Sequence, residues 1–82
     1  MIQVRVKLFA IYQDTVGQEE LMLDLPDGSA VEVVRDRLIQ DYPVLQQWRD
    51  ITRFGRNLEF VEPGTVLHNG DEVVLIPPVS GG

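Results

Sequence analysis

Apolar and polar positions alternate at the start of the chain. Every second side chain from residue 2 to residue 8 is apolar: Ile2, Val4, Val6 and Leu8. This period of two predicts a half-buried β-strand. Residues 21–25 repeat the alternation and predict a second strand, antiparallel to the first, which the turn sequence at 26–28 ends. The polar stretch 13–18 contains Gly17 and predicts a loop.

The pattern changes to a helical one after residue 28. Ser29 and Glu32 have the spacing of a capping box, which predicts that each side chain bonds the backbone N–H of the other residue. One helical stripe is apolar and is expected to be buried: Val31, Val34 and Leu38. Three polar residues are expected to face water: Arg35, Asp36 and Gln40. Pro43 predicts that the helix ends near Tyr42, and Leu45 and Trp48 are expected to pack just after it.

The second half of the chain predicts two more strands. Residues 52–61 predict one strand that Gly55 interrupts. Residues 72–76 are almost entirely apolar, which is typical of a central strand covered on both sides or partly covered by a partner. The order of strand, strand, helix, strand, strand predicts an α+β fold. One main helix would cover one face of a mixed sheet of four to five strands, with the last strand parallel to the first.

Composition excludes several classes of function. The chain has 82 residues, enough for one domain, and no cysteine, so disulfides, thiolate metal sites and cysteine nucleophiles are excluded. Its single histidine, His68, is expected to be a solvated loop residue, and no metal site is predicted. A net charge of −6 argues against nucleic acid as a partner. The longest apolar run, residues 73–79, is too short for a membrane span, and no signal peptide is evident, so we expect a soluble, cytoplasmic domain without a membrane partner.

The last six residues carry the candidate chemistry: Pro77, Pro78, Val79, Ser80, Gly81 and Gly82. Because two prolines cannot donate to a sheet, the folded domain is predicted to span residues 1–76 and residues 77–82 to form a flexible tail. Six extended residues reach about 20 Å, far enough to enter a channel in another protein. The missing side chain of Gly82 would let a nucleophile or an ATP phosphate approach its carboxylate. A frayed end without function is the alternative.

Phe9 is the candidate docking residue of the first strand. The alternation places it on the outward face with Arg5 and Lys7, where an exposed aromatic side chain indicates a docking patch. The alternative is a singly exposed aromatic residue, or one that loops of the same chain cover.

Residues 67–82 resemble the C-terminus of the molybdopterin synthase small subunit family, whose members typically end in a Gly-Asp-Glu-Val strand followed by Pro-Pro-Val, a small residue and Gly-Gly. Further matches are Leu8-Phe9-Ala10 and Asn57 with Phe60-Val61. The chain departs from the family where an apolar strand is usual, at Arg53, Gly55 and Arg56. The resemblance implies the β-grasp, or ubiquitin-like, fold.

The resemblance also implies a sulfur carrier. A separate activating enzyme, related to ubiquitin-activating enzymes, would adenylate the Gly82 carboxylate with ATP, and a sulfur nucleophile would convert it to a thiocarboxylate. The tail would then enter the large subunit of molybdopterin synthase, in a heterotetramer, and sulfurate the pyranopterin precursor. This chain would hold no cofactor and no catalytic side chain, and it would dock through Phe9, Phe60 and Ile76.

Three other functions remain open on the sequence. The same thiocarboxylate could serve thiamine, cysteine or tRNA thiolation. Gly82 could instead form an isopeptide bond to lysine, as in a ubiquitin-like protein modifier. The chain could also be a β-grasp binding module whose tail is inert.

Overall fold

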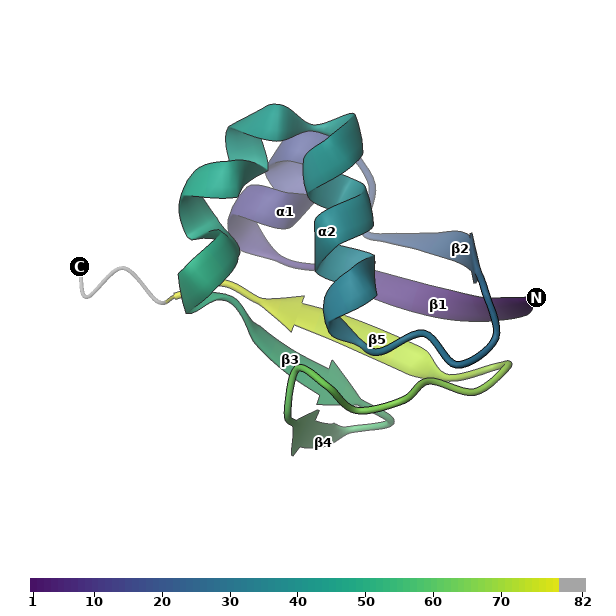
Figure 1. Ribbon diagram of the computed structural model, residues 1–82. Coiled ribbons are helices and arrows are strands. Elements are labelled where there is room, and N and C mark those ends of the chain that lie inside the picture. Colours follow the sequence, from purple (N-terminus) through teal and green to yellow (C-terminus); the bar gives the residue numbers. More distant parts are fainter. Residues whose placement is uncertain (79–82) are drawn as a thin grey trace.

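A computed structural model describes residues 1–78 as one mixed sheet with helices on one of its faces (Figure 1). The strands are β1 (Ile2–Leu8), β2 (Glu20–Leu25), β3 (Arg53–Arg56), β4 (Glu59–Val61) and β5 (Glu72–Ile76). The helices are α1 (Ala10–Val16), α2 (Glu32–Asp41) and the 3₁₀ helix η1 (Pro43–Ile51). The strand order is β2-β1-β5-β3-β4, in which β1 and β5 are parallel and the other neighbours antiparallel. The predicted fold class is therefore confirmed.

The core lies between the sheet and the helices. Alternate residues of β1, β2 and β5 point into it, because successive side chains of a strand face opposite sides of a sheet. The buried apolar residues are Val4, Val6, Leu8, Tyr12, Leu23, Leu25, Val31, Val34, Leu38, Leu45, Phe54, Leu67, Val73 and Leu75. The predicted stripe of α2 is among them, and the helix ends at Asp41 as expected. Within residues 1–78 no helix is long and apolar enough to cross a membrane.

The loop predicted at residues 13–18 is wrong, because most of it belongs to α1. This helix buries Tyr12 completely and packs Ile11 and Val16 against the edge of the core. Gly17 ends it with a left-handed φ of 83°, and its N–H donates to the carbonyl of Gln13 at 2.8 Å. A polar turn was therefore predicted where a short amphipathic helix links the two strands.

The capping box predicted at Ser29 and Glu32 is also wrong. The Ser29 hydroxyl donates to the Pro26 carbonyl at 2.6 Å instead of capping the helix. The backbone N–H of Glu32 donates to the Pro63 carbonyl at 3.1 Å, and that of Val31 donates to Thr65. The carbonyls that receive these helix N–H groups thus come from a loop about thirty residues further along the chain.

Residues 52–61 form a hairpin of two strands, not one interrupted strand. Asn57 and Leu58 make the turn with φ of 51° and 72°, both left-handed, as in the tight turns that suit twisted hairpins. Gly55 lies inside β3, opposite Phe60 of β4 and Val74 of β5. The hairpin therefore adds two strands to the sheet beyond β5.

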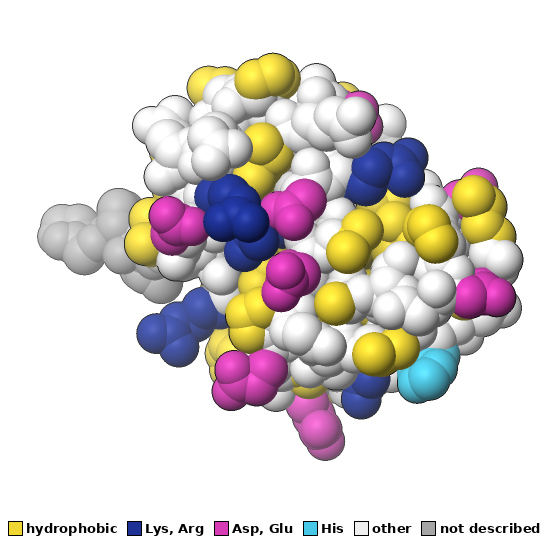
Figure 2. Space-filling view, viewed as in Figure 1, with side chains coloured by type: hydrophobic (Ala, Val, Ile, Leu, Met, Phe, Trp, Pro, Cys, Tyr) yellow, Lys and Arg dark blue, Asp and Glu magenta, His cyan; other side chains and the backbone are white. Residues whose placement is uncertain are grey.

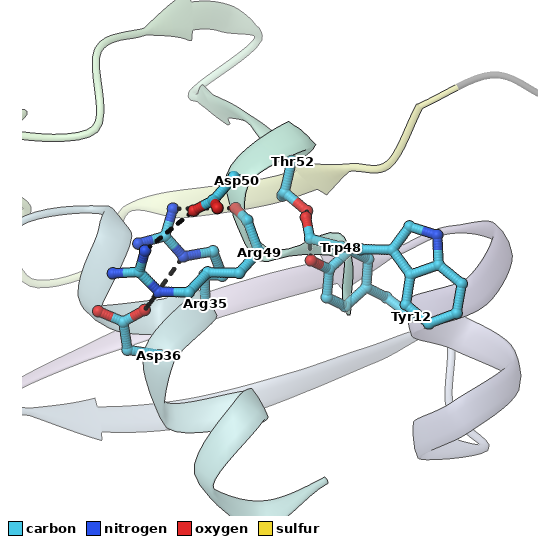
Figure 3. Close-up of polar contacts among 7 residues, drawn as sticks. All are labelled: Tyr12, Arg35, Asp36, Trp48, Arg49, Asp50 and Thr52. Carbon is cyan, nitrogen blue, oxygen red and sulfur yellow. Dashed lines mark hydrogen bonds and ion pairs between the residues drawn. The ribbon is translucent and has the colours of Figure 1, made fainter. Parts of the chain in front are cut away.

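Arg35 is buried, with 6% of its surface exposed, although the polar pattern placed it in water. Its guanidinium lies 5.3 Å from the centre of the Phe54 ring. Nε of Arg35 donates to Asp36 at 3.0 Å, and Nη1 donates to the Arg49 carbonyl at 3.3 Å (Figure 3). Arg35 thus connects α2 with η1 and β3. It also belongs to a small network of ion pairs, because Asp36 pairs with both Arg35 and Arg49.

A second polar contact ties α1 to the end of η1. The Thr52 hydroxyl donates to the Trp48 carbonyl at 2.7 Å, so the buried Tyr12 hydroxyl donates to Thr52 (Figure 3). Burial raises the pKa of Tyr12, against the lowering effects of the Thr52 hydrogen bond and the charge of Arg35. This contact fixes the start of β3, the neighbour of the strand that leads to the tail.

Candidate functional site: the open sheet face and the root of the tail

The face of the sheet turned away from the helices carries the candidate docking residues. The register places Gly55 beside Val74, and Ile76 beside Arg53, on this face. Phe60 lies opposite Gly55 and is 75% exposed. Within residues 1–78 no helix covers this side, so its apolar side chains are open to another molecule (Figure 1).

Two hollows meet at Phe60 and Ile76. The smaller, of about 170 Å³, is almost entirely apolar and is lined by Gly55, Leu58, Glu59, Phe60, Val74 and Ile76. The larger, of about 600 Å³, is lined by Asp50, Ile51, Thr52, Arg53, Phe60, Ile76, Pro77 and Pro78. The structure thus brings the predicted docking residues Phe60 and Ile76 together with the first two residues of the predicted tail.

Phe9 lies at a different place. It follows β1 directly, precedes α1 and is 50% exposed. Its own hollow, of about 290 Å³, is lined by Lys7, Leu8, Phe9, Gln13, Glu19 and Glu20. Phe9 is therefore open to solvent as predicted, but the hollow that it lines includes neither Phe60 nor Ile76.

The root of the tail follows β5 without an intervening element. The last strand ends at Ile76, and Pro77 and Pro78 follow it outside the sheet. Four of the predicted site residues lie outside the described residues: Val79, Ser80, Gly81 and Gly82.

The turn before β5 is held by Asp71 and Asn57. The backbone N–H of His68 donates to Asp71 Oδ2 at 2.8 Å, and the Asn57 amide donates to Asp71 Oδ1 at 3.1 Å. Asn57 Oδ1 in turn accepts from the backbone N–H of Glu72 at 3.0 Å. His68 is exposed, as predicted, and Gly70 has the expected left-handed φ of 88°. These bonds fix the tip of the β3–β4 hairpin against the start of β5.

The Asp71 carboxylate should make folding sensitive to acid. Partial burial would raise its pKa, but the bonds from His68 and Asn57 and the nearby positive charges lower it below the ordinary 3.8. Because the pKa of Asp71 is lower in the folded state than in the unfolded state, the ionised carboxylate stabilises the fold at any pH above the unfolded-state pKa. This contribution is lost as the pH falls through the folded-state pKa. Asp71→Asn should therefore destabilise the protein by about 1 kcal/mol at pH 7 and flatten the loss of stability below about pH 4. Urea unfolding across pH measures this.

Asp14→Asn, which changes an exposed carboxylate on α1, is the matched control for that series. An Asp71→Asn variant with the wild-type acid dependence would show that the bonds to Asp71 do not stabilise the native state.

Charges are mixed over the rest of the surface. Figure 2 shows acidic and basic side chains interspersed on the face that it displays. Arg49 pairs with Asp36 at 3.5 Å and with Asp50 at 3.1 Å, and on the open face Lys7 lies 3.9 Å from Glu72. Among residues 1–78 no three acidic or histidine side chains are grouped to hold a metal ion.

Sequence reasoning missed Leu58. It is 90% exposed, holds a left-handed φ of 72°, and lines the smaller apolar hollow. Leucine is unusual in that conformation, since the second turn position of such hairpins favours glycine. The only sequence signal was its place directly after Asn57, which becomes informative once the two strands around it are known.

The arrangement of elements defines a class of protein. Within residues 1–78, a mixed five-stranded sheet that holds one main helix, with its last strand parallel to its first, is the β-grasp, or ubiquitin-like, fold. The model of the ThiS family matches residues 6–82, and the chain belongs to this family.

Individual relatives agree with this assignment. The molybdopterin synthase sulfur carrier subunit of Chlamydomonas reinhardtii is 35% identical over 99% of this chain and 100% of its own. The crystal structure of SAMP1 from Haloferax volcanii has a TM-score of 0.81 at 30% identity and covers 98% of this chain and 99% of its own. A subunit in the complex of subunits 1 and 2 of the molybdopterin-converting factor from Helicobacter pylori shares the fold, with a TM-score of 0.66 at 23% identity over 99% and 100% of the two chains. The resemblance to molybdopterin synthase sulfur carriers is therefore confirmed.

Proposed function

We propose that this chain is the sulfur-carrying small subunit of a molybdopterin synthase. The observation that carries the proposal is full-length similarity to a sulfur carrier subunit of that enzyme, together with a last strand that leads directly into Pro-Pro-Val-Ser-Gly-Gly. The absence of cysteine from the sequence leaves the terminal carboxyl group as the place for transferable sulfur.

The chemistry is that of an activated carboxylate. A free carboxylate is a poor electrophile, so an activating enzyme would join the Gly82 carboxylate to AMP from ATP and release pyrophosphate. Sulfur at the oxidation level of sulfide would attack the acyl carbon, AMP would leave, and a thiocarboxylate would remain. Each chain with a thiocarboxylate then carries one sulfur atom, so the dithiolene of molybdopterin requires two such chains.

The remaining parts of the site would lie in partners. The large subunit would bind the pyranopterin precursor and receive the tail. Two small and two large subunits would form the complex. The activating enzyme would bind ATP. This chain would hold no cofactor of its own and would dock through Phe9, Phe60 and Ile76. We also propose a cytoplasmic location, a compartment that supplies the ATP for activation.

A second candidate is a ubiquitin-like protein modifier. The similarity to SAMP1 of Haloferax volcanii, a small archaeal modifier protein, favours it. In that case Gly82 would be joined to a lysine of a target protein through an isopeptide bond. A sulfur carrier for thiamine, cysteine or tRNA thiolation is the third possibility.

Intact-protein mass spectrometry separates a sulfur carrier from a modifier, and an assay of the sulfur-bearing chain with the large subunit and the pyranopterin precursor then separates the first function from the third. The full chain is incubated with ATP, a sulfide source and an activating enzyme of the ubiquitin-activating type. A sulfur carrier should gain the mass difference between sulfur and oxygen, whereas a modifier should form conjugates with other proteins. An unchanged mass with no conjugates would contradict both proposals and leave a binding module.

Acidic substitutions on the docking residues should weaken partner binding without unfolding the chain. Phe60→Asp and Phe9→Asp place a charge where we expect an apolar partner surface, and each should raise the Kd for the large subunit at least about tenfold. Both residues are exposed, so the melting temperature should change little.

Val44→Asp changes an exposed apolar side chain on η1 that lines none of the hollows at Phe9, Phe60 and Ile76, and it is the matched control. Wild-type affinity of Phe60→Asp or Phe9→Asp would remove that residue from the docking surface.

A further inference from the structure

A glycine in the middle of β3 leaves the small apolar hollow open. Gly55 lies opposite Phe60 and Val74, and its φ is outside the left-handed region, so backbone conformation does not require glycine there. A Cβ at this position would lie 3.6 Å from Cβ of Val74 and 4.0 Å from Cδ1 of Ile76, which is ordinary contact. Alanine would therefore fit, and its methyl group would enter the space between these two side chains. Glycine inside a strand often marks a place where another molecule approaches closely.

The wall of the hollow contains a residue that the fold itself does not need. Leu58 is almost fully exposed and holds a left-handed φ, which is strained for leucine because its Cβ comes close to the following carbonyl oxygen. Its side chain adds nothing to the core, because all core residues lie on the other side of the sheet. The hairpin turn explains the φ of Leu58 but not its exposed apolar side chain, and a side chain of that kind beside an open apolar hollow indicates binding.

The size of the hollow limits what can fill it. At about 170 Å³ it is close to the volume of an engineered apolar cavity that holds one benzene molecule. Glu59 is the only charged residue of its lining, and the others are apolar or glycine. It therefore suits one apolar side chain and excludes a larger polar ligand.

The position of the hollow places it beside any protein that reaches the end of the tail. The hollow shares Phe60 and Ile76 with the larger groove, which extends to Pro77 and Pro78. Four residues follow Pro78, and four extended residues reach about 14 Å. A protein that acts on the carboxyl group of Gly82 must therefore come within that distance of Pro78, next to the groove and the hollow.

We propose that the hollow over Gly55, walled by Leu58, Phe60, Val74 and Ile76, is a socket for one apolar side chain that projects from the protein receiving the tail. This inference rests on the proposed function, in which that protein is the molybdopterin synthase large subunit. Insertion of the side chain would position the partner at the end of β5, where the tail begins.

Two substitutions test the socket, because both should weaken binding without harming the fold. Gly55→Ala fills the floor of the socket and should raise the melting temperature, since alanine in a strand interior is favoured over glycine. Leu58→Asn removes one wall and relieves the strain, since asparagine tolerates a left-handed φ. Each should raise the Kd for the large subunit about tenfold in isothermal titration calorimetry with the full chain. Val44→Asn, on η1, should change neither quantity.

The outcomes separate the socket from the proposed function. If the wild-type chain binds the large subunit and both variants bind within about twofold of it, the socket is overturned and the proposed function stands. If the wild-type chain does not bind, the proposed function fails, and the occupant named here fails with it. A wild-type dimer that Gly55→Ala dissociates in analytical ultracentrifugation would assign the hollow to a second copy and overturn the inference.

Discussion

Deletion of Gly82 should abolish sulfur transfer and leave the melting temperature nearly unchanged. The proposed chemistry takes place on the Gly82 carboxyl group, whereas within residues 1–78 every core residue and every strand lies before Pro77. Removing Gly82 should therefore remove activity and leave this core intact. The measurements are formation of molybdopterin with the activating enzyme and large subunit, and thermal unfolding by circular dichroism.

Ser80→Ala is the control for this deletion, because it changes the tail and keeps the terminal Gly-Gly. This variant should form the thiocarboxylate and transfer its sulfur, whereas the chain without Gly82 should do neither. Sulfur transfer by the chain without Gly82 would show that the carrier group lies elsewhere, and loss of folding would show that the end of the chain is part of the domain.

Replacement of the buried Arg35 by alanine should give the largest loss of stability among the charged residues, about 2–4 kcal/mol. The substitution removes the packing of the guanidinium over Phe54 and the hydrogen bond to the Arg49 carbonyl, and it leaves space between α2, η1 and β3. For a domain of this size the melting temperature should fall by more than about 8 °C. Urea unfolding at pH 7 measures the change directly.

Arg35→Met separates packing from polar contacts. The methionine chain fills much of the same space without a charge, so this variant should recover about half of the loss. Arg37→Ala, on the same helix but only partly buried, should change stability by less than about 0.5 kcal/mol. An Arg35→Ala variant as stable as wild type would contradict the structural role given to the buried guanidinium.

The elements that the sequence predicted well are those whose pattern is local. The alternation in β1 and β2 and the stripe of α2 are each visible within about ten residues, and these elements form the centre of the fold. The capping box and the exposure of Arg35 were predicted wrongly because contacts with residues far away in the sequence determine them. The carbonyl of Pro63 receives the N–H of Glu32, and Phe54 covers Arg35, so neither the capping box nor the solvent-facing arginine could be judged from neighbouring residues.

The candidate site divides in the same way. The chemistry of the tail can be predicted because its residues are consecutive. The hollow could not be predicted, because Gly55, Phe60 and Val74 come from three strands and meet only in the observed register. The family resemblance predicted that Phe60 lies on the docking surface, but only the structure shows which residues lie beside it.

The most direct test of the account follows a single sulfur atom. The chain is first charged with sulfide, ATP and the activating enzyme, purified, and then mixed with the large subunit and the pyranopterin precursor. Intact-protein mass spectrometry should show the thiocarboxylate returning to carboxylate while molybdopterin forms, and mass spectrometry of a proteolytic digest should confine the change to the C-terminal peptide that ends at Gly82. A thiocarboxylate chain that keeps its sulfur under these conditions would contradict sulfur transfer from Gly82. Molybdopterin formed equally well with a C-terminally amidated chain would contradict it too.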